Sequence, residues 1–247
     1  YSNNFLFLFL FFIFFIPHTL YISFFKNPIG YFLLAIYGLL SAITVSICVF
    51  WENTSYLGNY FGFYLIIVDI VVISIMSIKF FAEDKKLKTD QLLLTSPLHV
   101  SKLVIGKFIG AYLVFWTCTL INIVYIIIID IFGIIDYGSL FTNFIGTVLL
   151  SGTMISIALF LSSLTENTII AAASSLAVLF GFMVIDFFAA FIPAEWLQNT
   201  LKSLTVYSYY DDFTNGILNL VPVVFYISVT AVMLFLTMRM IERRRWN

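Results

Sequence analysis

Charged side chains are scarce in this chain of 247 residues: Asp, Glu, Lys and Arg make up 10% of it, hydrophobic residues make up 62%, and the mean hydropathy is +1.07. A soluble globular domain carries about 25% charged residues, so this composition excludes a soluble fold. Apolar runs of about 20 residues indicate helices that cross a bilayer. The sequence therefore predicts an all-α integral membrane protein, with residues 1–247 forming one transmembrane domain.

Cysteine and histidine are too few and too scattered to suggest a metal centre or a disulfide. Cys48 and Cys118 each lie inside an apolar run, where we expect them to be buried small hydrophobes. His18 and His99 have no cysteine or carboxylate cluster around them, which favours solvated or interfacial histidines. A Walker-type GxxxxGK[ST] sequence is also missing, so the chain does not bind ATP by that route. We expect no catalytic residue, metal or cofactor on this chain.

The first segment, residues 1–28, is apolar but is not predicted to cross the membrane. Phe5 to Ile16 is a run of twelve apolar residues, short of the roughly 20 that a crossing needs. It lacks the basic region that opens a signal peptide. Residues 19–28 look amphipathic. We therefore expect an interfacial segment that lies along the membrane or against the bundle.

Six longer apolar runs follow, each long enough to cross a bilayer. The predicted spans cover residues 29–50, 60–82, 103–131, 140–164, 168–192 and 220–241. The first five therefore fall within residues 29–192, and residues 220–247 hold span six and a basic tail. Between them, residues 193–219 are more polar and form the predicted external segment.

The distribution of basic residues predicts the orientation. If both termini are cytoplasmic, Lys202 is the one basic residue of twelve that lies outside. Basic residues are enriched in cytoplasmic loops, so this bias predicts an even number of spans with both ends inside. The cytoplasmic set comprises Lys26, Lys79, Lys85, Lys86, Lys88, Lys102, Lys107, Arg239, Arg243, Arg244 and Arg245.

Residues 79–107 form the long charged interruption between spans two and three. Leu87, Gln91, Leu94 and Leu98 have roughly the spacing of one helical face. A break at TSP follows, where Ser96 suits an N-cap and Pro97 the first position of a new helix. The pattern predicts a short helix along the membrane, a break, and a helix that re-enters the bilayer.

Three consecutive leucines within this stretch favour a docking surface over a merely solvated loop. Leu92, Leu93 and Leu94 have no reason to face water, so they require a partner groove or the membrane surface. The acidic and basic residues before them could pair with a partner or with one another. The predicted docking residues are Glu83, Asp84, Lys85, Lys86, Leu87, Leu92, Leu93, Leu94, Thr95, Ser96 and Pro97.

Two carboxylates fall inside predicted spans. Asp69 lies in span two and Asp186 in span five, and a carboxylate in the bilayer costs at least ~2.5 kcal/mol, so each should face a cavity or a partner. These two are the candidate pathway residues. The alternative for each is a protonated Asp bonded to a neighbouring Ser or carbonyl. Small residues in span five (171–175) and span four (146–152) could serve plain packing, the pathway lining or a seam between subunits.

Several stretches together carry a resemblance to a family. The run EDKKLKTDQLLLTSPLHVSKLVIGKFIGAY, residues 83–112, resembles the first cytoplasmic loop of type-2 ABC exporter permeases. FFKNPIGYF (24–32), YYDDFTNGILNL (209–220) and FLTMRMIERRRW (235–246) agree in order and spacing, the last two resembling gliding-motility-type permeases. Lys88 departs from the family pattern, since a glycine is usual there, as do Asp90, Gln91 and Pro222.

The resemblance implies a half-transporter in the bacterial cell membrane. Two six-span permeases, copies or paralogues, would pair, and each would contact a separate cytoplasmic ATPase that carries ATP and Mg. The loop after span two would be the coupling helix, the pathway would switch between the pairs of spans two and five, and a re-entrant helix would cap the outer exit. The external gate candidates are Tyr210, Asp211, Asp212 and Phe213.

The predicted function is thus a non-enzymatic permease subunit of an ATP-driven exporter. A membrane anchor or sensor that recruits a cytoplasmic protein is the alternative, although six spans are excessive for an anchor. An intramembrane aspartate-dependent enzyme is less favoured, since the contexts IVDIV and VIDFF match neither motif of that class. No feature of the sequence indicates the substrate, or whether the permease pairs with itself or a paralogue.

Overall fold

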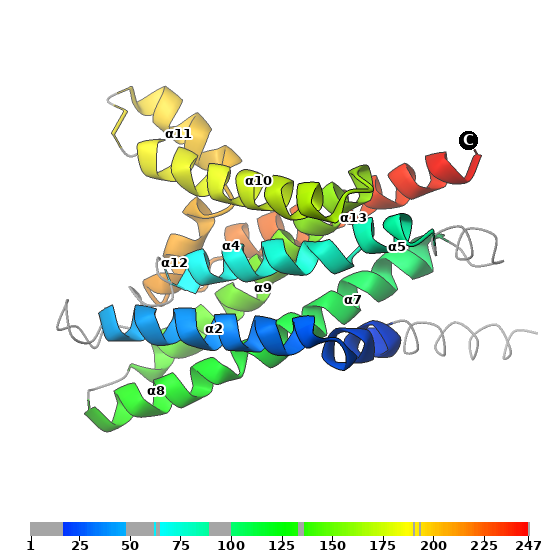
Figure 1. Cartoon of the computed structure of the whole chain (residues 1–247). Helices are drawn as coiled ribbons and strands as arrows, with labels where there is room; N and C mark the ends of the chain where they lie inside the picture. Colours follow the sequence, from blue (N-terminus) through cyan, green and yellow to red (C-terminus); the bar gives the residue numbers. More distant parts are fainter. Residues whose placement is uncertain are drawn as a thin grey trace, which may run out of the picture.

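The computed structural model describes residues 17–47, 62, 65–88, 100–132, 136–189, 191–192 and 194–246. Within these residues every regular element is a helix, and six helical segments are long and apolar enough to cross a membrane (Figure 1). The predicted all-α, six-span membrane protein is confirmed. Cys48 and His99 lie outside the described residues, whereas Cys118 is buried.

The first described helix, residues 17–26, turns sharply into α2 (Pro28–Ser46). Asn27 is extended and Pro28 occupies the first turn of α2, where its missing N–H costs nothing. A side chain at Gly30 would place its Cβ 2.4 Å from the carbonyl oxygen of Phe24, so the turn requires glycine. The helix 17–26 also contacts α7, because Leu20 lies against Gly110. The predicted interfacial segment is thus helical from residue 17 and lies against the bundle.

Spans two and three are both interrupted helices. Span two runs as α4 (Leu65–Met76), the 3₁₀ turn η3 (Ser77–Lys79) and α5 (Ala82–Lys86). Span three runs as α7 (Val100–Thr119) and α8 (Ile121–Phe132), separated by a turn at Leu120. The predicted length of span three allowed such a bend.

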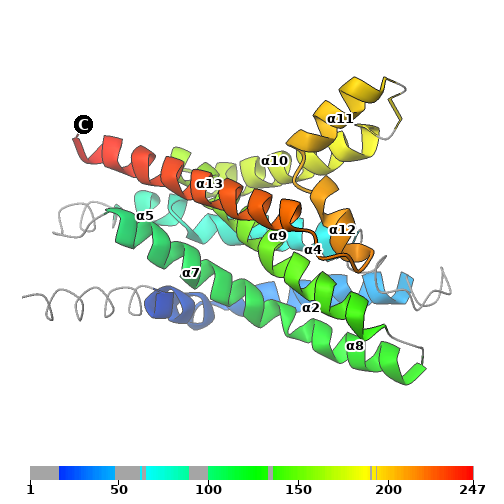
Figure 2. The ribbon, with the colours of Figure 1, turned by 180° about the vertical axis from the view of Figure 1, so that it is seen from behind.

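Helix α9 (Tyr137–Leu164) runs through the bundle, beside α4, α7, α10 (Thr168–Ala189) and α13 (Leu220–Trp246). Asp136 caps its start by accepting a hydrogen bond from Gly138 N at 3.0 Å. Figure 2 shows α13 lying along α9, where Thr153 Oγ1 and Thr230 Oγ1 are 3.2 Å apart. Helices α4 and α9 are largely buried, whereas α10 and α13 expose most of their apolar surface.

The predicted external segment is helical. Helix α11 (Glu195–Leu204) folds back against the end of α10 and projects from the bundle (Figure 1). The 3₁₀ turn η4 (Ser208–Tyr210) and the short α12 (Asp211–Thr214) then return to pack against α9. We call this region, with the adjoining ends of α4 and α10, the distal end.

Candidate functional site

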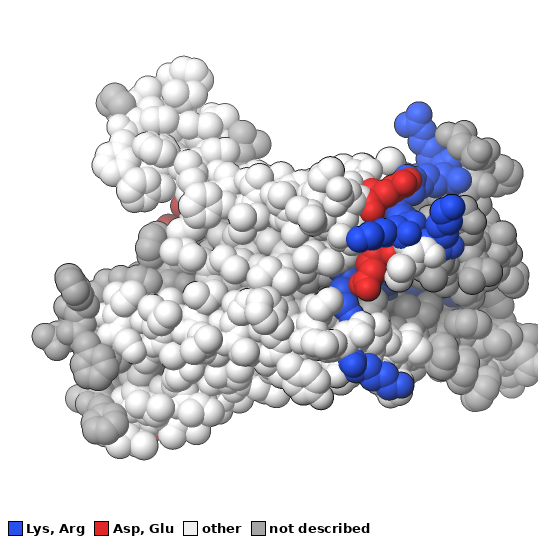
Figure 3. Space-filling view, viewed as in Figure 1, with Lys and Arg blue, Asp and Glu red and all other residues white. Residues whose placement is uncertain are grey.

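Charged side chains gather at one end of the described bundle, which we call the charged end (Figure 3). It comprises α5, the start of α7, the turn after α9 and the last turns of α13. Arg244 of α13 forms an ion pair with Glu166 of the TENT turn, at 2.5 Å. This ion pair joins two parts of the charged end that are 78 residues apart in the sequence.

Helix α5 is fastened to the end of α9 by one serine. Ser162 Oγ accepts hydrogen bonds from the backbone N–H groups of Phe81 and Ala82, both at 3.1 Å, and donates to Ser77 O at 2.9 Å. The two N–H groups are ones that the break between α4 and α5 would otherwise leave unpaired, whereas Ser77 O also accepts from Phe80 N at 3.3 Å. All five residues are buried. A displacement of α5 must therefore move α9 or break this network.

Two buried lysines hold α5 in place from its flanks. Lys107 of α7 is 5% exposed and bonds both Asp84 and the carbonyl oxygen of Phe80, with its ammonium 4.3 Å from the ring centre of Phe81. Lys85 is 8% exposed and donates to Ser163 O at the end of α9. Burying an ammonium is costly unless it is paired and hydrogen-bonded, so these contacts are required by the burial itself.

The predicted docking residues therefore divide into two groups. Asp84 and Lys85 are engaged within the chain, Glu83 is half-buried, and Lys86 and Leu87 are exposed. Lys88 follows with φ 57°, a left-handed backbone that favours glycine. Leu92, Leu93, Leu94, Thr95, Ser96 and Pro97 lie outside the described residues.

Asp69 lies in the middle of the bundle, 2% exposed. The Tyr37 hydroxyl of α2 hydrogen-bonds to its carboxyl group and accepts a hydrogen bond from Asn122 Nδ2 of α8 at 2.7 Å. Among the described residues Asp69 Oδ1 has no hydrogen-bond partner. The carboxyl group therefore faces the interior of the bundle, in a polar network that connects α4, α2 and α8.

Asp186, the second predicted pathway residue, lies half-buried near the distal end of α10. Its Oδ1 accepts hydrogen bonds from Thr205 Oγ1 at 2.9 Å and from Ser208 Oγ. The two hydroxyl oxygens are 2.6 Å from each other, so three oxygens form a small cluster. This cluster ties α10 to the segment between α11 and α12.

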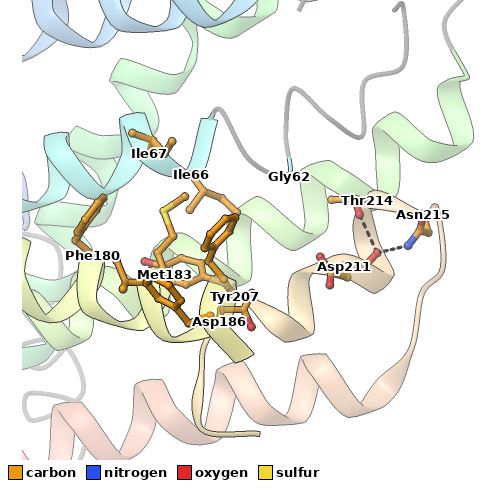
Figure 4. A pocket seen from close by; sticks show the side chains of 13 residues that line it. Gly62, Ile66, Ile67, Phe180, Met183, Asp186, Tyr207, Asp211, Thr214 and Asn215 are labelled. Atoms are coloured by element: carbon orange, nitrogen blue, oxygen red, sulfur yellow. Dashed lines mark hydrogen bonds between the residues drawn. The ribbon is translucent and has the colours of Figure 1, made fainter. Parts of the chain in front are cut away.

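A cavity of about 590 Å³ opens beside Asp186. Its walls come from α4, α10 and α12, with Tyr207 and Gly62 (Figure 4). The apolar side chains Ile66, Ile67, Phe180 and Met183 gather on one side of this view and Asp211, Thr214 and Asn215 on the other. We call it the distal cavity. Its full lining is Gly62, Ile66, Ile67, Phe180, Met183, Val184, Asp186, Phe187, Phe188, Tyr207, Asp211, Thr214 and Asn215.

Asp211 carries the second carboxylate of the distal cavity. Partial burial raises the pKa of its carboxyl group, and the nearby Asp186 raises it further, while Lys202 acts in the opposite direction. Asp212 turns elsewhere: its Oδ2 accepts a hydrogen bond from Asn219 Nδ2 at 3.2 Å. The two adjacent carboxylates therefore have different surroundings, and one of them lines the cavity.

Tyr210 and Phe213, the other external gate candidates, are buried anchors in this structure. The Tyr210 hydroxyl lies 3.0 Å from Thr147 Oγ1, and the carbonyl oxygen of Phe213 accepts from Thr142 Oγ1 at 3.1 Å. Gly146 makes room for both rings, since a Cβ there would lie 2.8 Å from each. The glycine predicted to allow close packing in span four therefore admits α12. Whether this segment opens as a gate stays a prediction.

Sequence reasoning missed several residues that build these sites. Ser162, Ser163 and Lys107 hold α5, Tyr37 bonds Asp69, and Tyr207 lines the distal cavity. Serine is common inside apolar helices, and a lysine at the end of a loop is usually solvated. The local sequence around these residues therefore did not predict their contacts with α5. Within the described residues, no group of three or more metal-ligating side chains comes together.

The fold defines a multi-pass membrane protein with charged side chains gathered at one end and a cavity that holds two carboxylates at the other. A family model described as ABC-2 family transporter protein matches residues 49–241, and the chain belongs to this family. The chain is thus a permease subunit of an ABC transporter, as the sequence predicted; the narrower likeness to gliding-motility-type permeases stays a prediction. Among curated proteins, no significant match to the sequence is found.

Proposed function

We propose that the chain is the transmembrane half of an ATP-driven exporter that works by alternating access. The charged end faces the cytoplasm and contacts a separate ATPase subunit, which carries Mg and ATP. A second permease, a copy or a paralogue, completes the assembly. The chain itself catalyses no reaction; its role is to convert closure of the ATPase into movement of its helices.

The basic residues support this orientation. The charged end holds Lys79, Lys85, Lys86, Lys107, Arg239 and Arg244, while Lys202 lies in α11 at the distal end. Because cytoplasmic loops are rich in Lys and Arg, the charged end is assigned to the cytoplasm. Both termini of the six-span chain are then cytoplasmic, in the membrane of a bacterial cell.

The observation that carries the mechanism is the continuity of α4 with α5 and the fastening of α5 to α7 and α9. We expect a push on α5, or on the leucines after it, to pass into the bundle, because hydrogen bonds from Ser162, Lys85 and Lys107 hold α5 to both α9 and α7. Helix α4 packs against α10, and the distal cavity lies between them. Movement of α4 therefore changes this cavity, which provides a route from ATP hydrolysis to the outer face.

In the proposed assembly, the exposed end of α5 and residues 89–99 form the surface that docks on the ATPase. Lys86 and Leu87 are exposed and Glu83 and Asp84 are half-buried, so these members of the predicted set reach the surface of the described chain. Leu92, Leu93 and Leu94 supply the apolar contact, since removing a buried anchor residue typically costs more than 1–2 kcal/mol of binding. Asp84 and Lys85 act from behind, by holding the surface in place.

Co-purification of the ATPase with the permease tests this proposal. Leu93→Asp should release the ATPase, or leave it bound with no hydrolysis stimulated by the permease. Leu218→Asp is the matched control, because Leu218 is 54% exposed at the distal end and should leave both readouts unchanged. Wild-type binding and hydrolysis for Leu93→Asp, with loss of both on replacing residues 165–168, would assign coupling to the TENT turn instead.

A further inference from the structure

We propose that the distal cavity binds an amphipathic organic cation, and that this is the chemical class of the exported substrate. The inference rests on the proposed transport function, which leaves the substrate undefined. Three features of the cavity carry it: its size, its apolar wall and the sign of its charged groups.

Size and lining match a small organic molecule. A volume of about 590 Å³ falls within the range of roughly 300–1,000 Å³ typical of small-molecule sites. The apolar side chains of Ile66, Ile67, Phe180 and Met183 gather on one side of the cavity (Figure 4). An inorganic ion would leave these side chains in contact with water, so the ligand must carry an apolar body.

The charged groups of the lining are all of one sign. Asp186 and Asp211 line the cavity, and no Lys, Arg or His does so among the described residues. Burial raises the pKa of Asp211 and the nearby Asp186 raises it further, while Lys202 of α11, which does not line the cavity, acts in the opposite direction. A ligand with a positive charge relieves this repulsion, whereas an anion would increase it.

One oxygen of Asp186 is available to such a ligand. Both hydroxyl donors that the structure shows for this carboxylate, Thr205 and Ser208, bond to Oδ1. Oδ2 accepts no hydrogen bond from any described residue, and the aromatic residues Phe180 and Tyr207 also line the cavity. Thr205 and Ser208 thus orient the carboxylate without neutralising it.

Equilibrium binding to the purified full chain in lipid nanodiscs tests the inference without any ATPase. The probes are tetraphenylphosphonium and tetraphenylborate, which share one shape and carry opposite charges. Empty nanodiscs report partition into lipid alone. We expect saturable binding of the cation, weakened about tenfold or more by Asp186→Asn, and retained by Asp186→Glu. Asp130→Asn, an exposed carboxylate on α8, is the matched control and should bind like the wild type.

Equal affinity for the two probes, or an unchanged cation affinity in both Asp186→Asn and Asp211→Asn, would overturn the inference. Retention by Asp186→Glu together with loss in Asp186→Asn excludes a folding defect as the cause, and monodisperse elution of each variant checks this independently. Failure here leaves ATPase co-purification intact, whereas failure of the transport proposal would leave cation binding intact, so the two outcomes are separable.

Discussion

Different interactions stabilise the two ends of the bundle. At the charged end, ion pairs and hydrogen bonds fasten α5 to α7 and α9 through Lys85, Lys107 and Ser162. At the distal end, aromatic rings pack into a notch at Gly146, and beside them a cavity with two carboxylates stays open. One end suits the transmission of force and the other suits the binding of a ligand.

The largest loss of stability is expected at the charged end, on removal of the carboxylate that pairs with the buried Lys107. Asp84→Asn would leave the buried Lys107 ammonium without its counter-charge, at a cost of about 3 kcal/mol in the free energy of unfolding. Unfolding in mixed detergent micelles measures this. Glu242→Gln, which breaks the exposed pair with Arg239, should cost below about 1 kcal/mol. Equal effects would show that the buried pair is no tighter than a surface pair.

A side chain at Gly146, where the rings of Tyr210 and Phe213 pack, should lower the stability of the fold by a smaller amount. Gly146→Ala places a methyl group 2.8 Å from the rings of Tyr210 and Phe213, so α12 must shift, at a cost of about 1–3 kcal/mol in the free energy of unfolding. Gly181→Ala is the matched control, because its Cβ would meet nothing within 4 Å. That variant should be neutral or more stable by up to about 1 kcal/mol, through its better helix propensity. Similar losses in both would argue against the notch.

A smaller effect of opposite sign is expected at Lys88. Its left-handed backbone costs a residue with a side chain about 1 kcal/mol, so Lys88→Gly should stabilise the fold by that amount. Lys86→Gly, within α5, should instead destabilise it by up to about 1 kcal/mol. Thermal unfolding of the two variants compares them directly, and destabilisation by Lys88→Gly would mean that the lysine side chain matters more than the backbone.

The pH dependence of cation binding should be the mildest effect. The raised pKa of Asp211 means that its carboxylate is lost at a higher pH than an ordinary Asp as the solution is acidified, so tetraphenylphosphonium affinity should fall a few-fold over that window. Asp186 of α10, Lys202 of α11 and the adjacent Asp212 face the same region and contribute to the charge that Asp211 experiences. Asp211→Asn should remove this step in a binding titration; a step that persists would assign it to another group.

The sequence predicted the bundle better than the sites. Six apolar runs predict six helical spans, because a chain segment in lipid must satisfy its own backbone hydrogen bonds. A carboxylate such as Asp69 within a span is expected to face the interior of the bundle, because its exposure to lipid is costly. The contacts of Lys107 could not be predicted, since its partner Asp84 lies across a loop, 23 residues away in sequence. Gly146 gave a packing signal without revealing that Tyr210 and Phe213, more than 60 residues later, would fill the notch.

At Lys88 the family pattern predicted a feature of the backbone that the local sequence did not. The resemblance places a glycine at this position, and the structure gives the physical reason, a positive φ at the end of α5. The distal cavity had no local signal at all. Its walls combine residues 62–67, 180–188 and 207–215, which meet through the packing of α4 against α10.

The central claim is that force applied at the charged end reaches the distal cavity through α4. Spin labels at Ile67 of α4 and Phe188 of α10, which both line the cavity, report their separation in the assembly with its ATPase, after Cys48 and Cys118 are replaced by alanine. We expect that trapping the ATPase with ADP and vanadate changes this distance distribution in the parent protein and leaves it unchanged in Leu93→Asp. The same nucleotide-dependent change in both proteins would contradict it.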